Sequence, residues 1–252
     1  MPHTDDILPG GTYAVVSCHA ERPLDDRVWS RFSKLQEDRP GGFRIAALLR
    51  PPDAAAGEPE HAWLERAREA ASRGPVGLHT HWTAPDHARP TGGDPAALVR
   101  RQVEWLRDRA GIEPAAFCGG GWYIDEAVAS ALAELGVTDC TATAFRPTYL
   151  PAGAARLHVE EPAYVELPTG GRVLELPTTH GLRRLARGVF APLRAPLVHA
   201  YFHDTDLLDP RRQAALRASL AVLGRRRTPI DLAEIQRGFV PAKTMSFARS
   251  RG

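Results

Sequence analysis

The sequence predicts an α/β fold in a single domain, a mostly parallel sheet that curls into a closed or nearly closed β/α barrel. Three observations predict this fold. Short extended runs alternate with amphipathic helical stretches, about seven such units fit in the chain, and polar residues gather where the runs end. A chain of 252 residues suits one large domain with a substantial core. We expect that domain to span residues 1–252, with its core at about 13–235.

The expected strands are short runs between helical stretches, and most of them are apolar. They are Tyr13–Cys18, Phe43–Leu49, Val76–His79, Ala115–Phe117, Thr138–Thr141, Arg172–Leu176 and Leu197–Phe202. Because strands alternate with helices, neighbouring strands are expected to run parallel.

The expected helices have clear beginnings and ends. Asp94-Pro95 supplies an N-cap and a proline at the first helical position, and Gly111 ends that helix. Its apolar stripe consists of Val99, Val103 and Leu106. The same pattern of caps and stripes, or of helical spacing alone, predicts four more helices at Asp26–Gln36, Glu60–Arg73, Asp125–Gly136 and Asp209–Gly224.

The composition excludes several classes of function. The 32 basic and 30 acidic residues nearly balance at a formal net charge of +2, whereas a nucleic-acid-binding protein normally has a basic face. No apolar run approaches membrane-spanning length, and Met1–Gly10 lacks the features of a secretory signal. Three cysteines without C-x-x-C spacing predict neither a disulfide framework nor a structural zinc site. We expect a cytoplasmic protein without nucleic-acid or membrane partners, and the oligomeric state stays open.

The most informative motif is Gly77-Leu78-His79-Thr80-His81-Trp82, at the end of the third expected strand. Residues i and i+2 of a strand point to the same face, so both imidazoles can reach one ion. Neutral imidazole is the commonest ligand of zinc-type metals in proteins. The alternative is a chance pair, since the chain has 10 histidines.

Titratable residues also follow other expected strands. Ser17-Cys18-His19-Ala20-Glu21 ends the first, Cys118-Gly119-Gly120-Gly121-Trp122-Tyr123 follows the fourth, and His203-Asp204 follows the last. In β/α barrels the chemistry lies at the carboxyl ends of the strands. A metal-dependent hydrolase needs a carboxylate, two imidazoles, a base, an acid and an open position for water. These segments supply a candidate for each.

The order of these features resembles the polysaccharide deacetylase family. Its members adopt a distorted (β/α)7 barrel and remove N- or O-acetyl groups with a divalent metal. The resemblance runs from about Tyr13 to Ile235. It places the family's acidic pair (T-F-D-D) at residues 17–21, its histidine motif (H-[ST]-x-x-H) at His79-Thr80-His81, its arginine motif (R-x-P-Y) at residues 118–123 and its last histidine at His203.

Three positions depart from the family's pattern. His19-Ala20-Glu21 replaces the acidic pair, His79-x-His81 replaces the wider histidine spacing, and Cys118 stands where the family has its arginine. In the family that arginine stabilises an anionic aspartate base. A neutral His19 base needs no cation beside it, because a nearby positive charge lowers the pKa of an imidazole. A carbohydrate-binding protein that has lost catalysis would show the same pattern, so both interpretations stay open.

The resemblance implies a metal-dependent hydrolase of the amide bond in a small N-acylated, sugar-like substrate, with zinc as the expected ion. Glu21, His79 and His81 would hold the ion. His19 would be the general base or a fourth ligand, and His203 the general acid that protonates the departing amine. The alternatives are that Glu21 is a solvated loop acid and that His203 is a capped strand-end histidine beside Asp204.

Four further residues are expected to contact the substrate. Trp82, Trp122 and Tyr123 could stack on a sugar ring, and Gly120 allows the backbone to approach a ligand closely. Core aromatic residues and a plain tight turn are the alternatives. The acids Asp25-Asp26 are instead expected to cap the next helix.

A third interpretation is a metal hydrolase of the phosphoesterase or amidohydrolase type. Leu78-His79-Thr80-His81 resembles the opening of those barrels, in which the histidine pair lies on the first strand. Here two strand–helix units precede it. The substrate, the acyl group and the identity of the metal stay open.

Overall fold

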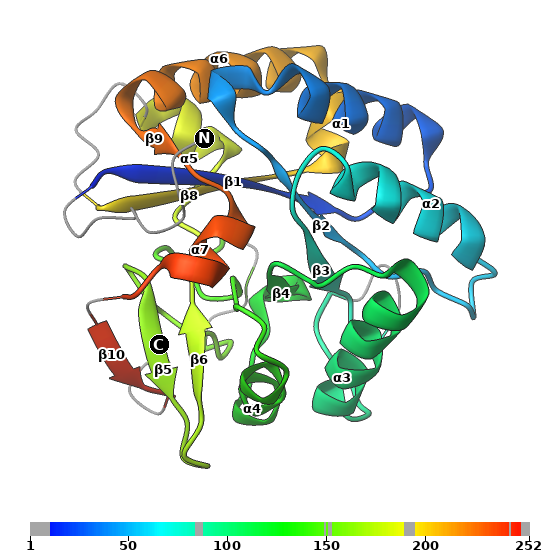
Figure 1. The fold of residues 1–252 in the computed structure, drawn as a ribbon, viewed down its shortest axis with the longest axis vertical. Coiled ribbons are helices and arrows are strands. Elements are labelled where there is room, and N and C mark those ends of the chain that lie inside the picture. The colour runs from blue at the N-terminus through cyan, green and yellow to red at the C-terminus, as the bar shows by residue number, and fades with distance from the viewer. Residues whose placement is uncertain are drawn as a thin grey trace.

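A mostly parallel sheet, curled through 210° into a half-barrel with helices around it, dominates the fold (Figure 1). The computed structural model describes residues 11–83, 88–148, 150, 153–188, 195–241 and 243–247, so Met1–Gly10, expected to lack a secretory signal, lies outside the described residues. The α/β barrel-type fold in a single domain is confirmed. The barrel is open along one side rather than closed.

The half-barrel has the strand order β4-β3-β2-β1-β8-β7, and β9 also pairs with β1. Its strands are β1 (Tyr13–Ala20), β2 (Ala46–Leu49), β3 (Val76–Thr80), β4 (Phe117–Gly119), β7 (His180–Gly181), β8 (Leu197–His203) and β9 (Thr228–Pro229). All of these pairings are parallel. The central β1 is buried along almost its whole length, as expected for an apolar strand covered on both faces. Register sets His19 of β1 opposite His203 of β8.

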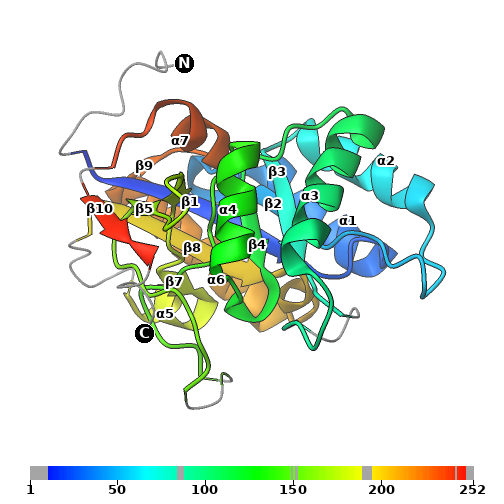
Figure 2. The same ribbon diagram turned by 90° about the horizontal axis from the view of Figure 1, so that it is seen from below.

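Helices cover the outer side of the curved sheet (Figures 1 and 2). They are α1 (Asp26–Asp38), α2 (Glu60–Ala71), α3 (Pro95–Trp105), α4 (Glu126–Leu135), α5 (Leu182–Gly188) and α6 (Pro210–Arg226). Helix α7 (Leu232–Gly238) packs instead on the inner side, where Leu232 and Ile235 are buried with Val15 and Leu48. Asp94, Asp125 and Asp209 cap α3, α4 and α6 by accepting backbone N–H bonds, as the sequence predicted. Asp25 caps α1 in the same way. A π-helical turn, Leu106–Ala110, extends α3 to Gly111.

The segment 138–141, expected as a strand, forms only isolated bridges. Asp139 bridges Phe117 on one side and Glu175 on the other, so this segment joins β4 to a second sheet. That sheet has the order β10-β5-β6, with β5 (Ala163–Glu166), β6 (Arg172–Glu175) and β10 (Lys243–Ser246). β6 was expected as a parallel strand but runs antiparallel to β5. The reason is the tight turn at Gly170, whose φ of 91° suits glycine.

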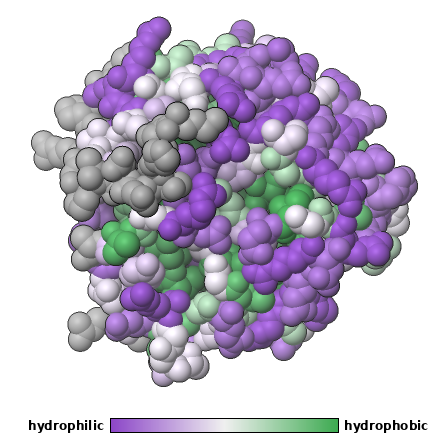
Figure 3. Space-filling model, in the orientation of Figure 1, coloured by the Kyte–Doolittle hydropathy of each residue, from purple (hydrophilic) through white to green (hydrophobic). Residues whose placement is uncertain are grey.

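The core lies between the half-barrel and its helices, and its large buried side chains include Trp29, Phe32, Trp63, Phe117 and Phe202. In the view of Figure 3 the outward faces of α1, α2 and α6 are mainly hydrophilic, as expected for helices that bury one face. Apolar residues reach this surface in its middle, over β2 and β3. Among the described residues, no helix combines the length and the apolarity that crossing a membrane requires.

Candidate metal centre

Three side chains from the ends of β1 and β3, the two strands on either side of β2, meet at the carboxyl edge of the half-barrel. Glu21 follows β1, His79 lies in β3, and His81 follows β3. Glu21 Oε1 lies 3.7 Å from His79 Nε2 and 3.5 Å from His81 Nε2. The ligand atoms of the three residues lie within 4.8 Å of one another. The i and i+2 spacing that the sequence shows thus turns both imidazoles toward one carboxylate.

These spacings fit a divalent ion. An ion with nitrogen and oxygen ligands about 2.0–2.1 Å away in tetrahedral geometry separates those ligands by about 3.3–3.5 Å. The Glu21 distances are at or slightly above that range and too long for good hydrogen bonds. Burial raises the pKa of Glu21, but the partnership with His79 and His81 outweighs it and holds the pKa well below its usual value. Glu21 is therefore an ionised carboxylate beside two imidazoles, which is a zinc-type donor set.

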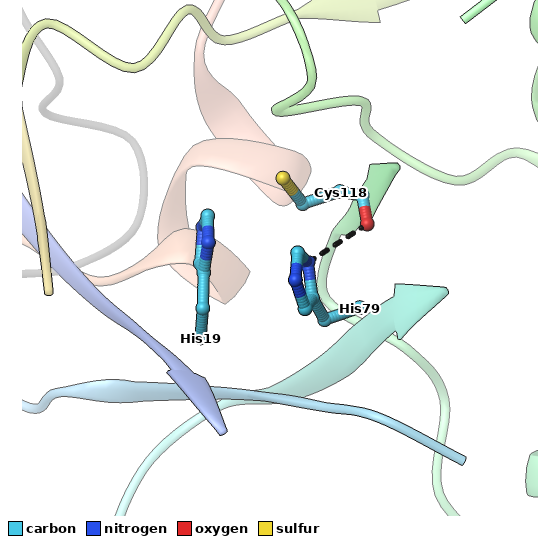
Figure 4. A group of neighbouring side chains, drawn as sticks. All are labelled: His19, His79 and Cys118. Atoms are coloured by element: carbon cyan, nitrogen blue, oxygen red, sulfur yellow. Dashed lines mark hydrogen bonds between the residues drawn. The ribbon is translucent and has the colours of Figure 1, made fainter. Parts of the chain in front are cut away.

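A hydrogen bond at the ring nitrogen that does not face Glu21 fixes the orientation of His79. Its Nδ1 lies 3.2 Å from the carbonyl oxygen of Cys118 in β4, and a carbonyl can only accept, so Nδ1 carries the proton. In the neutral ring the lone pair of Nε2 is then available to an ion beside Glu21. Figure 4 shows this bond, with the Cys118 sulfur pointing away from it. Histidine ligands of metals commonly have such a backing acceptor.

His19 stacks on His79, with ring centroids 4.4 Å apart and planes 26° apart (Figure 4). The ring is 2% exposed, and its Nε2 is buried without a hydrogen-bond partner among the described residues. Burial, reinforced by the neighbouring His79 and His203, lowers the pKa of His19 well below its usual value. His19 is therefore a neutral imidazole with an unused ring nitrogen at the edge of the site.

His203 faces the same carboxylate from β8. Its Nε2 lies 3.7 Å from Glu21 Oε1, and its side chain is 37% exposed, far more than those of His79 and His81. The adjacent Asp204 does not hold the imidazole. Its carboxylate accepts from the backbone N–H groups of Arg22 and Thr205, each at 2.8 Å, and so ties the end of β1 to the end of β8.

An aromatic wall closes one side of the site. Trp122 and Tyr201 pack on His19 with ring centroids 5.5 and 4.9 Å away, and Phe145 lies parallel to Tyr201 at 6.3 Å. Trp122 has a φ of 55°, a backbone region that non-glycine residues rarely adopt. Its buried Nε1 has no hydrogen-bond partner among the described residues. The strained turn thus holds an indole against the site.

A cavity of about 250 Å³ contains the site. The residues that line it are His19, Glu21, His79, Ala88, Gly119, Gly121, Trp122 and His203. The metal, base, acid and Trp122 candidates named from the sequence therefore lie together, although His81 belongs to the lining of a neighbouring cavity.

Three of the four expected substrate contacts lie beside this cavity rather than in its lining. Trp82 lines the neighbouring cavity of about 230 Å³ and donates from Nε1 to the Gly120 carbonyl. Tyr123 donates its hydroxyl to Asp125 at 2.6 Å. Gly120 packs beneath the end of β3, where an added Cβ would lie 2.6 Å from the Thr80 carbonyl oxygen. In the lining, Gly119 and Gly121 take its place.

Sequence reasoning did not identify Tyr201 or Phe145 as part of the site. Tyr201 precedes His203 by two residues on β8 and thus shares its face, a signal that the sequence contains. Phe145 lies in an irregular segment, and nothing local predicts its position. Cys118, at the β4 position of the family's arginine, is a buried thiol whose pKa is raised first by burial and then by Asp139 and Glu175. No cation therefore comes from this position to the side of His19.

Comparison with known proteins supports the fold. No family model and no curated protein matches the chain. Among solved structures it is similar to the 4-α-glucanotransferase of Thermococcus litoralis, with a TM-score of 0.63 and 12% identity over 94% of this chain. The match covers 42% of the glucanotransferase, so this chain spans less than half of that protein.

A second similar structure is a candidate polysaccharide deacetylase from Mycobacterium smegmatis. The TM-score is 0.56 and the identity 16%, over 89% of this chain and 88% of the other. At these identities the similarity shows the fold alone. It confirms the fold that the resemblance to the deacetylase family implied.

Proposed function

We propose that the chain is a metal-dependent hydrolase that removes an acyl group from the nitrogen of a small, sugar-like substrate. The observation that carries this proposal is the meeting of Glu21, His79 and His81 at ligand spacing inside a cavity at the carboxyl edge of the half-barrel. The two similar structures, a candidate polysaccharide deacetylase and a glucanotransferase, support a sugar-like substrate.

A divalent ion held by these three residues, with zinc as the simplest choice, would polarise the acyl carbonyl and lower the pKa of a water. The other steps belong to the side chains of the chain. His19 is neutral and has an unused Nε2, so it can accept the proton of the attacking water. His203 is more exposed and lines the same cavity, so it can donate a proton to the departing amine.

The first test is metal content together with turnover. Protein reconstituted with zinc, manganese or iron is analysed for bound metal and assayed for amine release from N-acetylglucosamine and its short oligomers. We expect one ion per chain. His79→Ala should lower both metal affinity and turnover at least 100-fold, because loss of a ligand exceeds the 10–100-fold effect of a group behind a ligand. His61→Ala, at an exposed histidine of α2, is the matched control.

The other interpretations give different results in the same experiment. Hydrolysis of a model phosphoester without hydrolysis of acetamides would identify a phosphoesterase. Stoichiometric metal without turnover of either substrate class would indicate a binding protein. Absence of bound metal after reconstitution would contradict the proposal as a whole.

A further inference from the structure

A third cavity, larger than the two described above, adjoins the candidate metal centre. It has a volume of about 860 Å³, and His203 lines both it and the cavity of the metal centre. Tyr201, which packs on His19, forms part of its wall. A substrate whose acyl group lay at Glu21 would therefore extend past His203 into this larger cavity.

The larger cavity is unusually rich in arginine. The described residues that line it include five arginines from three separate segments: Arg146, Arg183, Arg184, Arg211 and Arg212. Among the described residues of the lining the one acid is Asp206, whose carboxylate already accepts from the Arg212 guanidinium at 2.8 Å and from the His203 backbone N–H at 3.1 Å. The net charge of the whole chain is only +2, so this cationic character is local.

Three of these arginines have no carboxylate partner. Arg183, Arg184 and Arg211 form no ion pair with another described residue, whereas many surface arginines of this chain do. The positive charge of Arg184 acts on the neighbouring His180. Burial, together with Arg184 and Arg227, lowers the pKa of His180 to about 4. A cavity that keeps several unneutralised guanidinium groups is suited to an anion.

The rest of the wall suits a ring. Phe145 and Tyr201 lie almost parallel, 9° apart, and both line the cavity together with Leu182. Apolar and aromatic surface next to fixed cations fits a sugar that carries a charged group.

We propose that the substrate is anionic and that this arginine cavity binds its phosphate or carboxylate group while the acyl amine lies at the metal centre. The proposal rests on the function proposed above, and it adds the class of substrate. Guanidinium groups form bidentate hydrogen bonds with both phosphate and carboxylate, so the shared chemistry is an oxyanion on the sugar.

Binding to a protein without the ion tests the cavity by itself. In the His79→Ala variant, calorimetric titration compares N-acetylglucosamine 6-phosphate, N-acetylneuraminic acid and neutral N-acetylglucosamine. We expect at least one of the two anions to bind about 100-fold more tightly than the neutral sugar, and more weakly as salt rises. The anion that binds distinguishes a phosphate from a carboxylate.

Substitution then assigns the preference to particular residues. Arg183→Gln combined with Arg184→Gln is expected to bring the anion within a few-fold of the neutral sugar. Arg187→Gln removes one positive charge from the same helix, but Arg187 does not line the cavity, so it should leave the preference unchanged. Circular dichroism checks that each variant is folded.

Two results would overturn the proposal: equal binding of neutral and anionic sugars, or a preference that survives the double substitution. The function proposed above fails separately. If no amide is hydrolysed by the metal-loaded wild type, the binding comparison still decides whether the cavity selects anions. If amides are hydrolysed, kcat/KM for the anionic substrate should fall in the double variant while that for the neutral substrate should not.

Discussion

Two ligand sets share His79. Besides the set with Glu21 and His81, the ligand atoms of His19, His79 and Cys118 also lie within 4.8 Å of one another. The two sets differ in their chemistry. Glu21 is ionised and lines the cavity, whereas Cys118 is a fully buried thiol whose pKa is raised by burial. Because Glu21 lines the cavity that a substrate would enter and Cys118 does not, the Glu21 set is the better candidate for a catalytic ion.

Substitution separates the two sets. We expect Cys118→Ala to keep one ion per chain, and Glu21→Gln to lose it, with metal measured after dialysis against a weak chelator. Removing the thiol should cost about 1–2 kcal/mol of stability, because it leaves a small void in the core. Metal loss in folded Cys118→Ala protein would reassign the site to His19, His79 and Cys118.

His199 should make the free energy of unfolding depend on pH. It is fully buried, and its Nε2 lies 2.8 Å from the Ser17 hydroxyl. Burial lowers its pKa to about 4, against an ordinary value of 6.5. Between pH 6.5 and 4 the unfolded chain therefore binds a proton at His199 and the folded state does not. The contribution of His199 to the free energy of unfolding is complete above about pH 6.5. It is lost as the pH falls toward 4, by at most about 1.4 kcal/mol per pH unit.

The test compares wild type and His199→Gln by urea unfolding between pH 4 and 8. The variant should be less stable than wild type at pH 8, and the difference should shrink toward pH 4. The comparison isolates His199 from the other buried histidines, since those are unchanged. A difference that is constant across this range would contradict the assignment.

At the scale of elements, the turn after β4 and the end of β3 are packed backbone to backbone. A Cβ on Gly120 would lie 2.6 Å from the Thr80 carbonyl oxygen, 2.8 Å from that of Ala88 and 2.9 Å from His81 Cδ2. Real Cβ atoms do not approach other atoms so closely, so the two segments would have to separate. The glycine therefore sets the position of His81 without touching an ion.

Gly120→Ala is expected to destabilise the fold by about 1–3 kcal/mol and to weaken metal binding at least 10-fold, because His81 shifts. Gly92→Ala is the control, since nothing lies within 4 Å of its added Cβ. Thermal unfolding and competitive zinc titration measure the two effects. Unchanged zinc affinity in a destabilised Gly120→Ala protein would show that the turn is structural only.

The sequence predicted elements well where local signals were complete. The helices capped by Asp94, Asp125 and Asp209 form as expected, because each cap and stripe lies within a few turns. The segment 138–141 failed as a strand because its role, bridging β4 to β6, depends on pairing with distant residues. Helix α5 and strands β5, β7, β9 and β10 were missed because they are short. Helix α7 was missed although Asp231 and Glu234 form a capping box at its start.

The sequence likewise predicts one part of the candidate site and not the other. The meeting of His79, His81 and Glu21 follows from strand periodicity and from the rule that chemistry lies at strand ends, so the sequence could indicate it. The arginine cavity could not be predicted. Arg146, Arg184 and Arg211 come from an irregular segment, α5 and α6, and only the packing of the whole chain brings them together.

At the scale of the whole molecule, a buried pair of carboxyl groups joins the half-barrel to the second sheet. Asp139 and Glu175 are both fully buried. Asp139 accepts from the backbone and hydroxyl of Thr141, and Glu175 accepts from the Ala142 N–H at 3.0 Å. One oxygen of each, Asp139 Oδ2 and Glu175 Oε2, has no other partner among the described residues. Burial raises the pKa of both groups, and for Glu175 the neighbouring Asp139 raises it further.

The Asp139–Glu175 pair should change the stability of the fold with pH in the opposite direction to His199. Because the folded state holds a proton more tightly than the unfolded chain, the pair favours folding at low pH, and that stabilisation is lost as the pH rises above about 4. Glu175→Gln keeps the shape and an acceptor for Ala142, and its amide can donate to Asp139. It should therefore match wild type near pH 4 and be more stable by about 1–3 kcal/mol at pH 8.

Glu175→Leu, which leaves the Ala142 N–H buried without an acceptor, should be less stable at both pH values. Urea unfolding of the three proteins gives the comparison, and a Glu175→Gln variant no more stable than wild type at pH 8 would show that the pair is not a protonated link between the sheets.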